Sequence, residues 1–131
     1  MKLESYEKMV IYYQNKHGLN SYKFLIDREY YLHMLGCIGL TKKEQKEIIL
    51  DYSFIINNNR KWVRDVLLHE IAHALDPREG VTDYNIAHDK IFNMNCFRVG
   101  AVWQTHMIDK ILEQYDHYEY LLKCKYVPSM Y

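Results

Sequence analysis

The chain contains the pattern H-E-x-x-H, formed by His69, Glu70 and His73. On a helix, residues four positions apart lie one turn apart on the same face, so the two imidazoles can bind one metal ion. Zinc is the usual ion for imidazole ligands in this geometry. Glu70 is placed beside them to hold a water molecule. The pattern therefore predicts Zn²⁺ bound by His69 and His73, with Glu70 as the catalytic carboxylate.

A catalytic zinc site needs a third protein ligand and an open fourth position. The metzincin extension of the motif is not present, because Asp76 stands where its Gly belongs and Glu79 where its third His belongs. A thermolysin-like site takes a glutamate from a later helix. Glu113 and Glu119 are the only later glutamates, and they lie too far along the chain.

His88 is the better candidate for the third ligand. It follows His73 by 15 residues, and the loop after Pro77 allows the next helix to double back and present its first turn to the metal. We therefore predict that His69, His73 and His88 bind the metal. If His88 does not, Asp89 or Asp83 is next in line.

Other polar residues are candidates for supporting roles. Asp65 precedes His69 by four residues and is either a second carboxylate that orients this imidazole or a solvated helix residue. Asp76 and Asp89 have the same two interpretations. Tyr84, Arg78 and the C-terminal tyrosines are candidate donors to an oxyanion, and the sequence does not choose among them.

The elements before the motif are a helix followed by strand-type segments. Apolar residues at spacings of three and four predict a helix over about 3–17, which Gly18 ends. Strand-type residues fill 22–26, 30–40 and 47–51, and a charged turn occupies 41–46. Gly36 and Gly39 suggest a bulge or bend in the second of these strands. Residues 52–56 either continue the third strand or leave it.

The motif itself is predicted to lie on a helix over about 60–76, with Asn59 as its N-cap and Pro77 ending it. Further helices are expected over about 84–98 and 102–115. The end of the chain, 118–126, alternates polar and apolar residues like a strand or an extended tail. Together the elements predict an α+β fold in one domain, 1–131. We expect a small three-stranded antiparallel or mixed sheet packed on helices that include the motif helix.

Composition narrows the class of protein. The 131 residues are 49% hydrophobic and 26% charged, with zero net charge, as in a globular domain without a basic field for nucleic acid. Lys42, Lys43 and Lys46 form a small basic cluster, most simply a solvated turn. No signal peptide or membrane span is predicted. The three cysteines form no C-x-x-C pair, so we expect buried thiols in a reducing cytoplasm, that of the host if the protein is viral.

The stretch from Val66 to Leu75, followed by His88 and by Phe92 four residues later, resembles the SprT-like zinc metallopeptidases, the family of SprT and the Spartan protease domain. The resemblance covers roughly residues 20–100. It implies a zincin-like fold, Zn²⁺ on His69, His73 and His88, and catalysis by Glu70. Cys124 lacks the second cysteine of the C-terminal zinc ribbon found in many members, so no ribbon is expected.

The predicted function is hydrolysis of peptide bonds through a zinc-activated water with Glu70 as general base. The substrate would be a protein or peptide, which an exposed sheet edge could bind as an added strand. The family resemblance adds a weak association with DNA. The alternatives are a zinc-containing, non-catalytic SprT-like binding module for a protein or DNA partner, and a metal-free helical interaction protein. The oligomeric state is not predicted.

Overall fold

The computed structural model describes residues 1–78 and 90–101 of the chain. Within these ranges, three strands form a mixed sheet in the order β1-β3-β2: β1 (Lys23–Asp27), β2 (Gly39–Lys42) and β3 (Glu47–Asp51). β1 is parallel to β3, and β2 is antiparallel to it. The predicted α+β class and small three-stranded sheet are confirmed, and the sheet is of the mixed kind. This arrangement fits a zincin-like domain.

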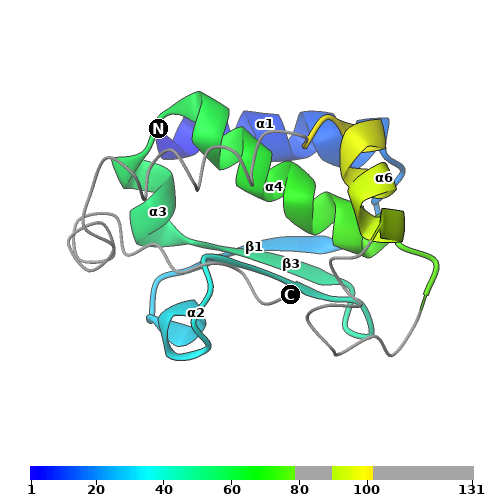
Figure 1. Ribbon diagram of the computed structural model, residues 1–131. Coiled ribbons are helices and arrows are strands. Elements are labelled where there is room, and N and C mark those ends of the chain that lie inside the picture. Colours follow the sequence, from blue (N-terminus) through cyan, green and yellow to red (C-terminus); the bar gives the residue numbers. More distant parts are fainter. Residues whose placement is uncertain (79–89, 102–131) are drawn as a thin grey trace.

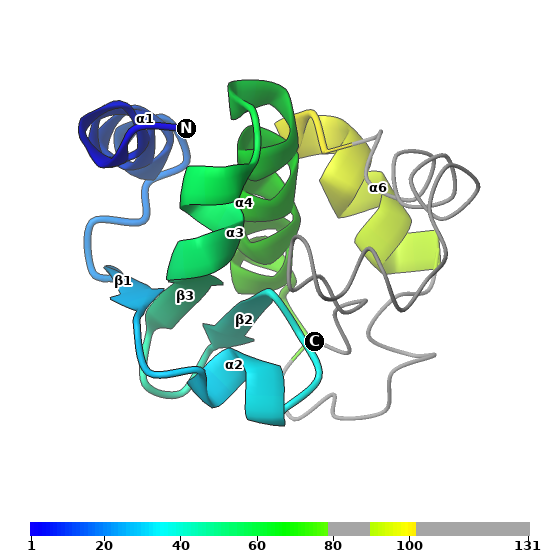
Figure 2. The same ribbon diagram turned by 90° about the vertical axis from the view of Figure 1, so that its left-hand side faces the viewer.

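The helices lie unequally on the two faces of the sheet. α1 (Leu3–Lys16), α4 (Arg60–Leu75) and α6 (Lys90–Val99) form a layer on one side, with α4 in the middle, and α2 (Tyr31–Met34) lies on the other side (Figures 1 and 2). Side chains of β3 alternate between these layers. Ile48 and Leu50 join the main core under α4, whereas Ile49 packs in a smaller cluster with the α2 side.

α1 forms because its apolar residues recur along one face. Tyr6 and Met9 are buried against the main core. His17 is the C-cap, and Gly18 follows with φ of +66°, the left-handed conformation that ends many helices. The helix predicted over 3–17 is confirmed, with His17 at its end.

Residues 30–40 are not the continuous strand that their composition predicted. Most of the segment is α2 and its connection, and β2 begins only at Gly39. The cause is a side chain at the end of β1. The Asp27 carboxylate accepts hydrogen bonds from the backbone N–H groups of Glu29 at 3.0 Å and Leu32 at 2.8 Å, which turns the chain out of the sheet. Gly36, with φ of +73°, then reverses the chain after α2.

The predicted charged turn is also shorter than 41–46, because Thr41 and Lys42 belong to β2. The chain leaves β3 at Asp51, whose side chain caps α3 (Tyr52–Asn57) by accepting a hydrogen bond from Phe54 N–H at 2.9 Å. Residues 52–56 therefore leave the third strand rather than continue it.

The motif helix has the ends that the sequence predicted. Asn59 is the N-cap of α4, and its side-chain oxygen accepts a hydrogen bond from Trp62 N–H at 3.1 Å. The helix ends at Leu75, just before Asp76 and Pro77. Both of its ends are thus fixed by local chemistry, which sets where the motif lies above the sheet.

Some expectations lie outside the described residues: the start of the helix predicted over 84–98, the helix over 102–115, the tail over 118–126, and Cys124. The described part of that first helix is α6. Cys37 and Cys96 are buried free thiols, as expected. Among the helices that the structure describes, none combines the length and the apolar character needed to cross a membrane.

Candidate active site

The candidate site is built around the C-terminal half of α4. His69, Glu70 and His73 are all buried there, and the ring centroids of the two imidazoles lie 4.9 Å apart. One helical turn separates the two histidines, so both rings lie on the same side of the helix. The motif therefore forms a buried pair of imidazoles with a carboxylate next to it in the chain.

α6 closes this pair on one side through an aromatic residue. The ring of Phe92 stacks on His73, with centroids 4.1 Å apart and an interplanar angle of 22°. The same ring contacts His69 edge-on at 4.8 Å. Phe92 is only 2% exposed, so it holds both imidazoles from within the core. Restricting the rings in this way lowers the entropy that they lose on binding a common ion.

Glu70 points toward the sheet and is fully buried, with 0% exposure. Its Oε1 lies 3.0 Å from Oγ1 of Thr41 on β2, and this hydroxyl is also 2.8 Å from the backbone carbonyl oxygen of Glu70. Burial raises the pKa of the Glu70 carboxyl well above its usual range, and the Thr41 hydrogen bond lowers it by a smaller amount. Among the described residues, Oε2 has no hydrogen-bond partner.

Close packing of α4 on the sheet depends on Gly39. A Cβ atom at this position would lie 2.9 Å from Oε2 of Glu70 and 3.0 Å from its Cγ. Gly39 was predicted to mark a bulge or bend. Instead it sits within β2, opposite Leu50 of β3, and makes room for the carboxylate.

Further buried polar side chains lie near the pair. Asp65 is 4% exposed, which excludes the solvated position that was one of its two interpretations. Asn95 of α6 is 5% exposed. Burial raises the pKa of the Cys96 thiol to about 12, and the nearby charges of Asp65 and Glu70 add smaller increases.

A family model, described as the SprT-like family, matches residues 6–113. The chain belongs to the SprT-like family. The match is longer than the resemblance seen in the sequence and includes α1 from residue 6 onward, the three strands, α4 and α6. Searches of curated proteins and of solved structures gave no match.

In this SprT-like chain, the described residues contribute two of the three predicted metal ligands. Among residues 1–78 and 90–101, no group of three His, Cys, Asp or Glu side chains is arranged to hold a metal ion. His88 lies outside these ranges, as do Tyr84 and Asp89. The two imidazoles nevertheless fit zinc in residue type, in helical spacing and in their shared face. His88 as the third ligand stays a prediction.

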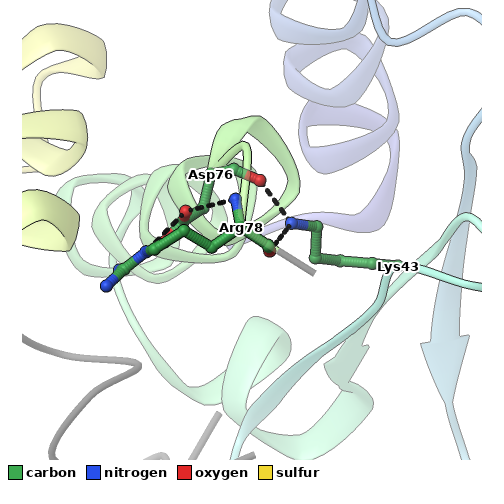
Figure 3. Close-up of polar contacts among 3 residues, drawn as sticks. All are labelled: Lys43, Asp76 and Arg78. Atoms are coloured by element: carbon green, nitrogen blue, oxygen red, sulfur yellow. Dashed lines mark hydrogen bonds and ion pairs between the residues drawn. The ribbon is translucent and has the colours of Figure 1, made fainter. Parts of the chain in front are cut away.

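The end of α4 is fastened by a separate cluster. The Arg78 guanidinium forms a two-pronged ion pair with Asp76, with its Nη2 2.7 Å from Oδ2 and its Nε 3.0 Å from Oδ1 (Figure 3). The Lys43 ammonium donates to the backbone carbonyls of Asp76 and Arg78. Asp76 and Arg78, candidates for roles at the metal and the oxyanion, are thus bound to each other.

This cluster also changes the interpretation of the basic residues in the turn. Lys43 caps the end of the motif helix, and the Lys42 ammonium lies 4.9 Å from the centroid of the Tyr31 ring.

A cavity of about 350 Å³ lies beside this turn, lined by Tyr22, Lys43, Glu44, Lys46, Ala74, Asp76 and Pro77. Its lining includes none of the motif residues.

The sequence did not single out Thr41, because Glu70 is 29 residues away along the chain. The sequence around Thr41 is that of a charged turn, and nothing in it indicates a contact with a residue of the motif helix. The one available hint was that Gly39 and Thr41 are two residues apart, which places both on one face of a strand.

Proposed function

We propose that this SprT-like protein is a zinc metallopeptidase that hydrolyses peptide bonds in protein or peptide substrates. The observation that carries the proposal is the buried pair of His69 and His73 on one face of α4, with the fully buried Glu70 between them in sequence. Membership of the SprT-like family supports the same class of activity.

The three predicted ligands have defined tasks in this proposal. The imidazoles of His69 and His73 hold the ion, and His88 completes the set. Zinc, when bound, supplies a Lewis acid that lowers the pKa of water and polarises a carbonyl group. Phe92 contacts both imidazoles of α4 and restricts their movement.

Glu70 moves the proton. Its carboxylate accepts a proton from the attacking water as the new C–O bond forms at the peptide carbonyl. The same carboxyl group then gives this proton to the leaving nitrogen as the C–N bond breaks. Water is consumed, and a carboxylic acid and an amine are released. Atoms and charge balance without any further reactant.

The burial of Glu70 favours a catalytic site over a purely structural one. A buried carboxylate destabilises the fold unless its charge is well compensated, and here a single hydroxyl is the described partner of the side chain. Two histidines and a third ligand can hold a structural ion without that carboxylate. The loss of stability caused by burying this carboxylate is therefore expected in a catalytic site, where the carboxylate takes part in the reaction.

β2 is the candidate strand for binding substrate. It lies at one edge of the described sheet, and its Thr41 contacts Glu70. An extended peptide added to this edge would pass close to the carboxylate. The family resemblance suggests a weak association with DNA. DNA is therefore an additive in the assay below, although the proposed chemistry does not need it.

The test is cleavage of an unfolded protein by the purified chain, with and without single-stranded DNA. We expect fragments to appear, to disappear when a zinc chelator is added, and to return when zinc is restored. A serine-protease inhibitor serves as the control for a contaminating enzyme and should have no effect. Cleavage that continues unchanged in excess chelator would contradict the proposal.

A further inference from the structure

We propose that Thr41 is a positioning residue that holds the Glu70 carboxylate in one orientation against β2. The inference rests on the proposed function, since it concerns the same carboxylate. It adds a residue of β2 to the group formed by His69, Glu70 and His73 on α4. Thr41 acts through Glu70 and has no contact of its own with the reacting atoms.

The Thr41 hydroxyl contacts two oxygens of Glu70. Oγ1 of Thr41 lies 3.0 Å from Oε1 and 2.8 Å from the backbone oxygen of Glu70. Both acceptors lie within hydrogen-bond distance, and they share the single hydrogen of the hydroxyl. Thr41 pairs with Ile48 of β3, whose side chain is in the main core, so the hydroxyl is on the face of the sheet toward α4. Its β-branched side chain has few allowed rotamers, and this keeps the hydroxyl in place.

The backbone of Gly39 packs closely against the Glu70 carboxylate. Its Cα lies so close to Glu70 that an added Cβ would come within 2.9 Å of Oε2, 3.0 Å of Cγ and 3.2 Å of Cδ. The carboxylate thus lies against β2, between the Thr41 hydroxyl and the backbone of Gly39. Rotation of the carboxylate away from this position would break the contact of Oε1 with Thr41.

The two oxygens of the Glu70 carboxylate have different surroundings. Oε1 is bound by Thr41, and Oε2 has no hydrogen-bond partner among the described residues. The two oxygens are therefore not equivalent. Oε1 is the oxygen held by Thr41, so loss of the hydroxyl would release the carboxylate from this orientation.

The experiment compares Thr41→Val with Thr41→Ser in the full chain. Val replaces the hydroxyl by a methyl group of similar size, and Ser keeps the hydroxyl. We expect kcat to fall by about 10-fold in Thr41→Val, the worth of a hydrogen bond to a charged group, while KM stays within about twofold. Thr41→Ser should keep kcat within about threefold of the parent.

Zinc content is measured on each sample and should not differ, because Thr41 is not a ligand. Gly39→Ala is a second variant, expected to lower kcat because its new methyl group displaces the carboxylate. Equal kcat in Thr41→Val and the parent would overturn the proposal. An equal fall in Thr41→Val and Thr41→Ser would also overturn it, since it would show that shape rather than the hydroxyl matters.

A second measurement is independent of catalysis. Thr41→Val should lower the melting temperature in the parent, and by less in a Glu70→Leu background, where the hydroxyl keeps its backbone partner but has lost the carboxylate. Equal shifts in the two backgrounds would show that the pair is not coupled and would overturn the proposal. If the parent cleaves nothing, the proposed function fails. The coupling then still decides whether Thr41 holds Glu70.

Discussion

Phe92 of α6 stacks on His73 of α4, with ring centroids 4.1 Å apart, and so joins the fold of the core to the candidate metal site. The same ring touches His69. We expect Phe92→Leu to lower the free energy of unfolding by about 1–2 kcal/mol and to weaken zinc binding by roughly 10-fold, because both imidazoles gain freedom. Thermal or denaturant unfolding and a zinc titration measure the two effects.

Phe97→Leu is the matched control on the same helix. Phe97 is 77% exposed, so its replacement should change stability by no more than about 0.5 kcal/mol and leave zinc affinity as in the parent. Equal zinc affinity in Phe92→Leu and Phe97→Leu would show that the aromatic contact does not support the histidines.

The third metal ligand is tested by histidine variants. If His88 binds the ion, His88→Ala should weaken zinc binding far more than His106→Ala or His117→Ala, which serve as controls of the same residue type. Zinc content after dialysis against a weak chelator is the measurement. Similar retention in all three variants would move the third ligand elsewhere, first to Asp89 or Asp83.

The ion pair at the end of α4 predicts a dependence of stability on pH. The hydrogen bonds between the Asp76 carboxylate and Arg78 hold the pKa of the Asp76 carboxyl below its usual range. A lowered pKa in the folded state stabilises the fold above the pKa of the unfolded state, and this contribution is lost as pH falls through the folded-state pKa. Asp76→Asn should therefore cost about 1–2 kcal/mol at pH 7 and progressively less below about pH 4.

Chemical unfolding at pH 7 and at pH 3 checks this prediction. Glu7→Gln, on the exposed side of α1, is the control and should show little change at either pH. A deficit of the same size at both pH values would mean that the Asp76 charge is not the source of its effect.

The buried cysteines are predicted to be unreactive in the folded protein. Burial first, and then nearby carboxylates that include Glu70, raises the pKa of Cys37 and of Cys96 to about 12. Only about 10⁻⁴ of each thiol is then ionised at pH 8, and the thiolate is the reactive form. In a Cys124→Ser variant, a colorimetric thiol reagent should detect no fast-reacting thiol until denaturant is added, and two afterwards. Fast labelling of the native variant would contradict the burial of these residues.

The motif helix could be predicted well because its signals are local. Asn59 caps its start, Pro77 follows its end, and apolar residues cover more than one face between them. The histidine pair follows from helical spacing alone. Each of these features depends on residues within a few positions of one another, so one sequence is enough to identify them.

The region of α2 was wrong in the sequence prediction because its cause is not in its own composition. Tyr30 to Leu40 is rich in residues that favour strands, yet the Asp27 carboxylate binds the N–H groups that begin a turn. The contact of Thr41 with Glu70 likewise joins two elements 29 residues apart. Such contacts depend on how the sheet and α4 pack, which periodicity does not encode.

The most direct test of the central claim is the proteolytic turnover of Glu70→Gln, with zinc measured on the same sample. Gln keeps the size of the side chain and an acceptor for the Thr41 hydroxyl, but it has no basic carboxylate. We predict a folded protein with a full complement of zinc and a turnover lower than that of the parent by roughly 10²–10⁴-fold. Digestion of an unfolded protein by Glu70→Gln at the rate of the parent would contradict the account.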